Sequence, residues 1–412
     1  MRIVLVTYGS RGDIEPMAAL ALQLQDLGVG VRMCAPPDFA ELLDGTGIPV
    51  TPIGWPIRAL AIGALGGLPK TLADIAAKLT AMIYEAVATA ANGCDAVVAT
   101  GSPPAMAGAR AAAEKLGIRY LATALSPYQL PSPHHKPVFR PGSLMPPEEV
   151  DRRVLWDFNA EHLNELFGEP VNTHRASIGL PPRDNIRDHI LTDKPFLAAD
   201  PVLGPWPQPA YLDVTQTGAW IRPDERRLPT SLQAFLEAGT PTVYVGFSSM
   251  PMRAATEIAR AAIEAVRAHG GRVLLNIGWA NLALIDERND CFVVGEVNQQ
   301  ALFHRVAAVV HHGGAGTTTA AASAGAPQLV VPQGVDQHYW ADRVTELGLG
   351  MGHDGPTPTA GSLSTALDVV LAPQTVARAA ALAKTVRADG AEQAAKLLLE
   401  MKGHRGFATA PG

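Results

Sequence analysis

The stretch 307–325 is the sequence feature that most constrains what this chain can fold into. It reads AAVVHHGGAGTTTAAASAG: a short apolar run, a histidine pair, a glycine-rich loop, and three threonines that lead into an alanine-rich segment. That order predicts a buried strand, a tight turn and the first turn of a helix. Glycines let the backbone approach a ligand closely, and the N–H groups and dipole of a helix N-terminus favour negative charge.

Two common nucleotide-binding patterns are absent from the sequence. The GGAGTT run has Thr319 where a dinucleotide fingerprint needs its third glycine, and no acidic residue follows at the expected ribose position. No GxxxxGK[ST] loop occurs, and the nearest run, 66–71, contains a proline. The histidines and hydroxyls that flank the loop instead suit a phosphate or diphosphate. The alternative is an ordinary connection in an α/β fold.

Apolar runs alternate with helical spacing along the rest of the chain. Strand-like residues 2–7, a glycine turn at 9–13, a helical segment at 16–27 and a second apolar run at 29–35 predict a parallel doubly wound sheet. The alternation restarts at 242–246, after the proline-rich segment 200–229. We therefore expect an N-terminal domain at 1–205, a linker at 206–220, a C-terminal domain at 221–395, and a helix end with a frayed tail at 396–412.

Composition narrows the class of protein. The chain has 412 residues, 47% of them hydrophobic, which is enough for two buried cores. A net charge of −6 gives no reason to expect a nucleic-acid or anionic-membrane partner. Three widely spaced cysteines without a CxxC pair favour reduced thiols, and no apolar run is long enough to span a bilayer. We expect a soluble cytoplasmic protein without stable membrane insertion, and the oligomeric state stays open.

Three polar residues are candidates for chemistry. Asp13 lies in the glycine turn after the first predicted strand, where it can be a general base or can cap the following helix. Asp336 and Gln337 offer a carboxylate and an amide at adjacent positions, which suits sugar hydroxyls. An N-cap pair at the start of a helix is the alternative for these two.

Two irregular segments, 55–69 and 127–147, carry further candidates. Trp55, Tyr128 and Phe139 can form an apolar platform for an acceptor, or can simply pack in the core. His134 and His135 have no further histidine, cysteine or carboxylate nearby at the spacing of a zinc site, so we expect no metal there.

Several motifs together resemble one known family. GSRGDIEP at 9–16, QTGAWIRPDER at 216–226, CFVVGEVNQQALF at 291–303 and HHGGAGTT at 311–318 are similar to nucleotide-sugar glycosyltransferases of the GT-B type, and among them to the actinobacterial vancomycin group. The resemblance implies an α/β GT-B fold, in which two Rossmann-like parallel-sheet domains face each other across a cleft. The N-terminal domain would bind the acceptor and the C-terminal domain the nucleotide-sugar donor.

The activity implied by the resemblance is transfer of a hexose or deoxyhexose from a dTDP- or UDP-sugar to a hydroxyl of a natural-product aglycone. A glycopeptide is the first expected acceptor and a polyketide the second. Transfer would invert the anomeric carbon without a required metal or other cofactor. The alternatives are a nucleotide-sugar epimerase, a sterol or lipid glycosyltransferase, and a sugar-nucleotide binding protein without turnover.

The resemblance also implies roles for individual residues. The catalytic base would be Asp13. Diphosphate contacts would come from Ser10, Ser249, His312, Gly313, Gly314, Gly316 and Thr317. Val297 and Gln299 would border the nucleobase, and Asp336 and Gln337 would hold the sugar. The acceptor would contact Trp55, Tyr128, His134 and Phe139. Ser248 departs from the family pattern, because it stands where a glycine is usual.

Overall fold

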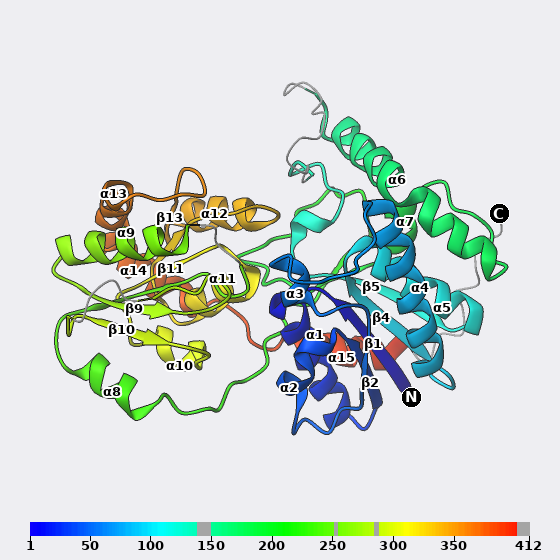
Figure 1. The fold of residues 1–412 in the computed structure, drawn as a ribbon, viewed down its shortest axis with the longest axis horizontal. Coiled ribbons are helices and arrows are strands. Elements are labelled where there is room, and N and C mark those ends of the chain that lie inside the picture. Colours follow the sequence, from blue (N-terminus) through cyan, green and yellow to red (C-terminus); the bar gives the residue numbers. More distant parts are fainter. Residues whose placement is uncertain (138–149, 251–253, 284–287, 402–412) are drawn as a thin grey trace. The chain divides into compact units, whose positions relative to one another are not determined.

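The computed structural model describes residues 1–137, 150–250, 254–283 and 288–401, which form two compact units (Figure 1). The N-terminal unit consists of Met1–Ala199, Pro205–Arg222 and Ala388–Gly412. The C-terminal unit consists of Asp200–Gly204 and Pro223–Arg387. The chain therefore crosses between the two units more than once.

The N-terminal unit is built on a parallel sheet with the strand order β3-β2-β1-β4-β5-β6-β7. Its strands are β1 (Arg2–Tyr8), β2 (Gly30–Ala35), β3 (Val50–Pro52), β4 (Ala96–Gly101), β5 (Arg119–Ala124), β6 (Phe196–Leu197) and β7 (Thr215–Gln216). Its helices are α1 (Arg11–Asp26), η1 (Pro37–Phe39), α2 (Ala40–Leu43), α3 (Ile57–Ala61), α4 (Leu72–Ala90), α5 (Pro103–Leu116), η2 (Pro127–Gln129), α6 (Arg152–Ser177), α7 (Ile186–Leu191) and α15 (Gly390–Glu400).

The side chains of β1 point alternately to the two faces of this sheet and are buried on both. Val4 and Val6 pack in one core with Ile83 of α4. Ile3 and Leu5 point to the other face, where α1 lies against β1, and both are fully buried. Burial on both faces explains why the strand reads as a continuous apolar run.

The C-terminal unit has a second parallel sheet, with the order β10-β9-β8-β11-β12-β13. Its strands are β8 (Thr242–Gly246), β9 (Arg272–Asn276), β10 (Cys291–Val294), β11 (Ala308–His311), β12 (Gln328–Val330) and β13 (Gly350–Gly352). Its helices are α8 (Thr230–Glu237), α9 (Ala255–Ala268), α10 (Gln299–Phe303), α11 (Ala315–Ser323), α12 (Gln337–Glu346), α13 (Ala360–Val370) and α14 (Pro373–Ala383).

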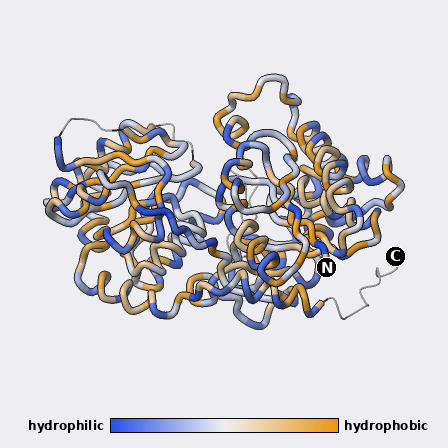
Figure 2. The backbone as a smooth tube through the Cα atoms, turned by 90° about the horizontal axis from the view of Figure 1, so that it is seen from below, coloured by the Kyte–Doolittle hydropathy of each residue, from blue (hydrophilic) through white to orange (hydrophobic). Residues whose placement is uncertain are grey.

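The second sheet is covered on both faces as well. Val243 and Val245 share a core with Ile263 of α9 and Leu367 of α13. Tyr244 points to the other face, where its ring lies 5.1 Å from that of Phe303. Hydrophobic and hydrophilic stretches alternate along the backbone in both units (Figure 2). Two Rossmann-like parallel-sheet units of this kind are the building blocks of the GT-B fold, as expected.

The helix α15 belongs to the N-terminal unit, although the sequence pattern from 373 to 401 predicts one continuous helix that begins in the expected C-terminal domain. Instead, α14 ends at Ala383 and α15 packs on α1. A Cβ on Gly390 would lie 2.4 Å from the carbonyl oxygen of Ala219, so the start of α15 packs directly on backbone of the N-terminal unit. Residues 388–395 thus lie outside the expected domain, and 206–220 is part of the N-terminal unit rather than a separate linker.

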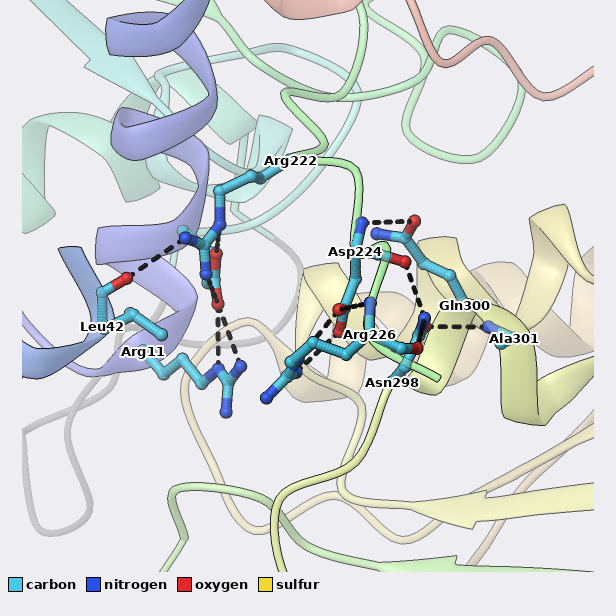
Figure 3. A network of polar contacts seen from close by, with 9 residues as sticks. Arg11, Leu42, Arg222, Asp224, Arg226, Asn298, Gln300 and Ala301 are labelled. Carbon is cyan, nitrogen blue, oxygen red and sulfur yellow. Dashed lines mark hydrogen bonds and ion pairs between the residues drawn. The ribbon is translucent and has the colours of Figure 1, made fainter. Parts of the chain in front are cut away.

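The chain passes from the first unit to the second around Pro223, between two anchored residues (Figure 3). On the N-terminal side, Arg222 binds Glu15 of α1 and the carbonyl oxygen of Leu42. On the C-terminal side, the Asp224 carbonyl accepts a hydrogen bond of 2.6 Å from Asn298 Nδ2. Each anchor lies within its own unit.

Among the helices of the described residues, none is by itself long and apolar enough to cross a membrane. The pair α13 and α14, bent by 63°, passes the same test of length and composition.

Candidate functional site

His311, the last residue of β11, has a structural role. Its ring is fully buried, with Nε2 2.9 Å from Oε1 of Gln328 and Nδ1 accepting the N–H of Gly313 at 3.1 Å. Burial lowers its pKa to about 3, so the ring is neutral and Nε2 carries the proton given to Gln328. His311 therefore fixes the start of the glycine loop.

His312 is placed differently. It is 8% exposed, and its Nδ1 is buried without a hydrogen-bond partner among the described residues. Burial lowers the pKa of the ring to about 4. A Cβ on Gly314 would lie 2.6 Å from Nε2, so the ring occupies space that only glycine leaves open. A buried ring nitrogen without a partner loses free energy unless a ligand satisfies it.

The N-terminus of α11 lies next to this ring. Its N-cap is Gly314, which has no side chain to cap the helix, so the first N–H groups are left for other acceptors. Thr318 and Thr319 donate their hydroxyls back to the carbonyls of Gly314 and Ala315. Gly316 is exposed and Thr317 is buried. The first helical turn thus offers a candidate anion site, in the position that the sequence analysis expects for a diphosphate.

The loop keeps its shape because Gly313 has a φ of +91° and lies against two neighbours. A Cβ at this position would lie 2.7 Å from Cγ1 of Val330 and 3.0 Å from the carbonyl oxygen of Gln337. Any larger residue would therefore push the loop away from β12 and α12.

Ser249 lies on a turn that follows the neighbouring strand β8. In the sheet, Gly246 of β8 pairs with His311 of β11, so the turn and the glycine loop emerge side by side. Ser248 has a φ of +47°, and its carbonyl accepts the N–H of Trp279 at 2.8 Å. The left-handed backbone explains why glycine is usual at this position in the family that the chain resembles.

Asp336 and Gln337 follow β12, on the other side of β11. Asp336 is the N-cap residue of α12, but its carboxylate makes no capping bond and instead accepts from Trp340 Nε1 at 3.1 Å. Gln337 is 6% exposed, and its Oε1 accepts the N–H of Gln333 at 2.7 Å. That bond fixes the amide orientation of Gln337 and leaves its NH₂ group as the donor.

Val297 and Gln299 lie after β10, further along the same sheet edge. Val297 is 9% exposed and contributes to the core around Tyr244. Gln299 begins α10 and donates to the Tyr244 hydroxyl at 3.2 Å. Between them, Asn298 caps α10 and binds the carbonyls of Asp224 and Arg226 (Figure 3).

These groups follow the strand order along the carboxyl edge of one sheet. Val297 and Gln299 follow β10, Ser249 follows β8, the loop of His312 follows β11, and the Asp336 pair follows β12. Four strand spacings separate the two ends, or about 19 Å. With the roles that the resemblance implies for these residues, the order along the edge is nucleobase, diphosphate, sugar, as in a nucleotide sugar.

In the N-terminal unit, Asp13 lies at the carboxyl end of β1. The structure starts α1 at Arg11, earlier than expected, and Asp13 is the third residue of this helix. Its Oδ2 accepts the N–H of Ser10 at 2.8 Å, and a Cβ on Gly9 would lie 2.1 Å from the same oxygen. Asp13 is therefore not the cap that precedes the helix, as the alternative had it, but the third helical residue of a capping box whose N-cap is Ser10, and its side chain is only half-buried.

The acceptor candidates are spread along the edge of the first sheet. The N–H of Trp55 donates to the Tyr8 hydroxyl at 3.1 Å, which ties Trp55 to the end of β1. Tyr128 lies in η2, after β5. His134 is exposed, with Nε2 2.9 Å from the Pro209 carbonyl. Phe139 lies outside the described residues.

An aromatic cluster that the sequence did not predict holds the loop that contains Tyr128. The ring of His135 lies 5.9 Å from Tyr128, 5.6 Å from Trp156 and 6.2 Å from Trp206. Trp156 Nε1 donates to the carbonyls of Ser132 and His135. Burial lowers the pKa of His135 to about 4, so this ring is neutral. The paired histidines were the only signal of the cluster in the sequence.

Within the described residues, no group of three or more histidine, cysteine, aspartate or glutamate side chains is arranged to hold a metal ion. The three cysteines are buried thiols.

Two curated proteins match nearly the full length of the chain. Glycosyltransferase GtfE of Amycolatopsis orientalis is 52% identical over 406 residues, which cover 98% of each chain. The vancomycin aglycone glucosyltransferase of the same organism is 51% identical over 403 residues, or 97% of each chain. The chain is a vancomycin-group glycosyltransferase.

Family models match both units of this glycosyltransferase. Residues 3–131 match the glycosyltransferase family 28 N-terminal domain, and residues 282–397 match the C-terminal domain of the erythromycin biosynthesis protein CIII-like family. The second match includes His312, Asp336 and Gln337, and the first includes Asp13.

Solved structures agree on the GT-B fold of the glycosyltransferase. The glycotransferase of kitacinnamycin has a TM-score of 0.72 at 20% identity and covers 97% of this chain and 98% of its own. Glycosyltransferase VinC in complex with dTDP has a TM-score of 0.67 at 20% identity, with 98% and 100% covered.

Proposed function

We propose that this glycosyltransferase moves a sugar from a dTDP- or UDP-sugar to a hydroxyl of a natural-product aglycone, with inversion and without a required metal. The observation that carries the proposal is the order of polar groups along one sheet edge, from Gln299 through Ser249 and His312 to Asp336. It matches the order of nucleobase, diphosphate and sugar in the donor.

The diphosphate is the leaving group, and negative charge grows on it as the glycosidic bond breaks. The N–H groups at the start of α11 and the neutral ring of His312 are hydrogen-bond donors held in place before reaction. Fixed donors of this kind stabilise developing charge without reorganisation, which is the role a metal ion has in other transferases. Ser249 adds a hydroxyl to the same group, and the resemblance implies a further hydroxyl from Ser10.

The acceptor hydroxyl attacks the anomeric carbon from the face opposite the diphosphate. A bond forms from the acceptor oxygen to that carbon while the bond to the diphosphate oxygen breaks, so the configuration inverts. The acceptor proton goes to the carboxylate of Asp13. Ser10 N–H holds one carboxylate oxygen, which fixes the orientation of the base.

For the nucleotide of the donor, dTDP is the first candidate and UDP is the second. The solved structure of VinC, a structural neighbour, is a complex with dTDP. For the acceptor, a glycopeptide is the first candidate, because relatives above 50% identity include an enzyme named for the vancomycin aglycone. A polyketide is second, supported by the erythromycin biosynthesis name of the C-terminal family.

A mass-spectrometric screen tests the proposal. The purified protein is incubated with dTDP- and UDP-sugars against glycopeptide, polyketide and sterol acceptors, with and without a chelator. We expect one acceptor to gain the mass of one sugar, one nucleoside diphosphate to be released per transfer, and no effect of the chelator. The anomeric coupling constant of the product reports inversion.

Other outcomes identify the alternatives. A donor whose sugar changes configuration with no acceptor present would make the protein an epimerase. Saturable donor binding without transfer to any acceptor would make it a binding protein.

A further inference from the structure

Val335 combines a left-handed backbone with an exposed apolar side chain. Its φ is +55° and it is 68% exposed. A β-branched residue is disfavoured in that region, because its Cβ crowds the following carbonyl oxygen. Burial does not offset this strain, since the side chain faces solvent. Residues kept in such conformations are concentrated at functional sites.

Hydrogen bonds on both sides of Val335 maintain this conformation. The N–H of Gln337 donates to the Gly334 carbonyl at 3.2 Å and closes the turn around Val335. Gln333 gives its N–H to Gln337 Oε1 at 2.7 Å and its side-chain amide to the Pro356 carbonyl at 2.9 Å. The backbone of Val335 is therefore held between bonded neighbours, unlike that of a loose surface loop.

The turn lies next to the anion site within the same unit. Val330 of β12 pairs with His311 of β11, and Gly313 leaves no room for a Cβ against Val330 and Gln337. Val335 directly precedes Asp336 and Gln337. It therefore lies in the part of the sheet edge where the donor sugar is proposed to bind.

We propose that Val335 is a specificity residue that contacts the C–H face of the donor sugar. The inference rests on the proposed function. A pyranose ring has hydroxyls around its edge and C–H groups on its faces, so a sugar held by Asp336 and Gln337 through hydroxyls still presents an apolar surface. Water leaves both the isopropyl group and that surface when they meet, which favours binding.

Calorimetry on Val335→Ala and Val335→Thr tests this inference. Binding of TDP-glucose and TDP, and of UDP-glucose and UDP, is measured for the full-length protein and each variant. The ratio of the two dissociation constants isolates the sugar. We expect Val335→Ala to weaken the nucleotide sugar about tenfold relative to the nucleotide. Val335→Thr keeps the shape but presents a hydroxyl, so a loss in the same direction is expected.

Val369→Ala is the matched control, because Val369 is a 45% exposed valine on α13 of the same unit. It should leave the ratio unchanged. An unchanged ratio in both Val335 variants would overturn the inference, and so would equal weakening of nucleotide and nucleotide sugar, which would assign Val335 to the diphosphate loop. A wild-type protein that binds neither nucleotide would instead reject the proposed function itself.

Discussion

Arg222 and Glu15 form a two-bond ion pair although 207 residues separate them in the sequence. Nε of Arg222 donates to Oε2 at 2.7 Å, and Nη2 donates to Oε1 at 3.0 Å. The side chains are 22% and 25% exposed, so solvent screens the pair only in part. The pair joins the end of the segment Pro205–Arg222 to α1, the helix that carries Asp13.

Arg222→Ala should lower the free energy of unfolding by about 2 kcal/mol, because it removes charge-assisted hydrogen bonds and leaves Glu15 without one partner. Chemical denaturation measures the change. Lys396→Ala is the control, since its pair with Glu392 is about half exposed and should contribute less than about 0.5 kcal/mol. Equal effects of the two substitutions would contradict a structural role for the Arg222 pair.

Asp13→Asn should lower turnover by about 10²- to 10⁴-fold while leaving donor affinity nearly unchanged. The amide oxygen can still accept the N–H of Ser10, but the amide cannot take up the acceptor proton. Asp13→Ala should also lose about 1 kcal/mol of stability, because it removes the capping contact. Steady-state kinetics and denaturation separate the two effects, and full activity of the Asn variant would remove Asp13 as the base.

His312→Ala should weaken binding of the nucleoside diphosphate by about 10- to 100-fold, which corresponds to one lost hydrogen bond to a charged group. His311→Ala should instead reduce stability, since Gln328 and the N–H of Gly313 lose their partner. Calorimetry with TDP and UDP and thermal unfolding of both variants measure the contrast. Unchanged nucleotide binding in the His312 variant would count against the diphosphate assignment.

Acid should destabilise the C-terminal unit through its buried histidines. The folded pKa is about 3 for His311 and about 4 for His312, below the ordinary 6.5. Between pH 6.5 and 4 the unfolded chain takes up protons that the folded chain does not, so their contribution to stability is complete above 6.5 and is lost as the pH falls. Each histidine adds a slope of up to about 1.4 kcal/mol per pH unit.

Denaturation midpoints between pH 4.5 and 7.5 measure that slope. His312→Gln removes one titrating ring and should reduce the slope by up to one proton. A variant with the wild-type slope would show that His312 does not titrate differently in the two states.

Ser248→Gly should stabilise the protein by about 0.5–1 kcal/mol, because glycine adopts the φ of +47° without strain. Ser249→Gly is the control: its backbone is not left-handed, so the same change should be neutral or destabilising. Thermal unfolding of both variants measures the difference, and a destabilised Ser248 variant would show that its side chain contributes contacts that outweigh the strain.

Local patterns in the sequence were sufficient to predict the two parallel sheets. Strands buried on both faces read as apolar runs, as at Val243–Val245, and the glycine loops at Gly9 and Gly313 mark strand-to-helix turns. The start of α1 was harder to predict from the sequence. The helix begins at Arg11, where Asp13 accepts the N–H of Ser10, ahead of the first residue of the apolar pattern.

Long-range packing explains what the sequence could not predict. No glycine or proline interrupts 384–389, and the end of α14 is accompanied by a bond from Arg387 N–H to Asp200, 187 residues away. The arrangement of Gln299, Ser249 and Asp336 along one edge depends on strand order, which differs from chain order. The left-handed backbone of Val335 depends on hydrogen bonds made by its neighbours.

The position of α15 has a consequence for the order in which the protein matures on the ribosome. Every residue of the C-terminal unit, up to Arg387, is synthesised before α15. The N-terminal unit is begun first but is completed only after the C-terminal unit, because the surface of α1 that α15 covers stays open until α15 has been synthesised. A stop codon shortly after Arg387 would therefore remove α15 from the N-terminal unit, and leave every residue of the C-terminal unit in place.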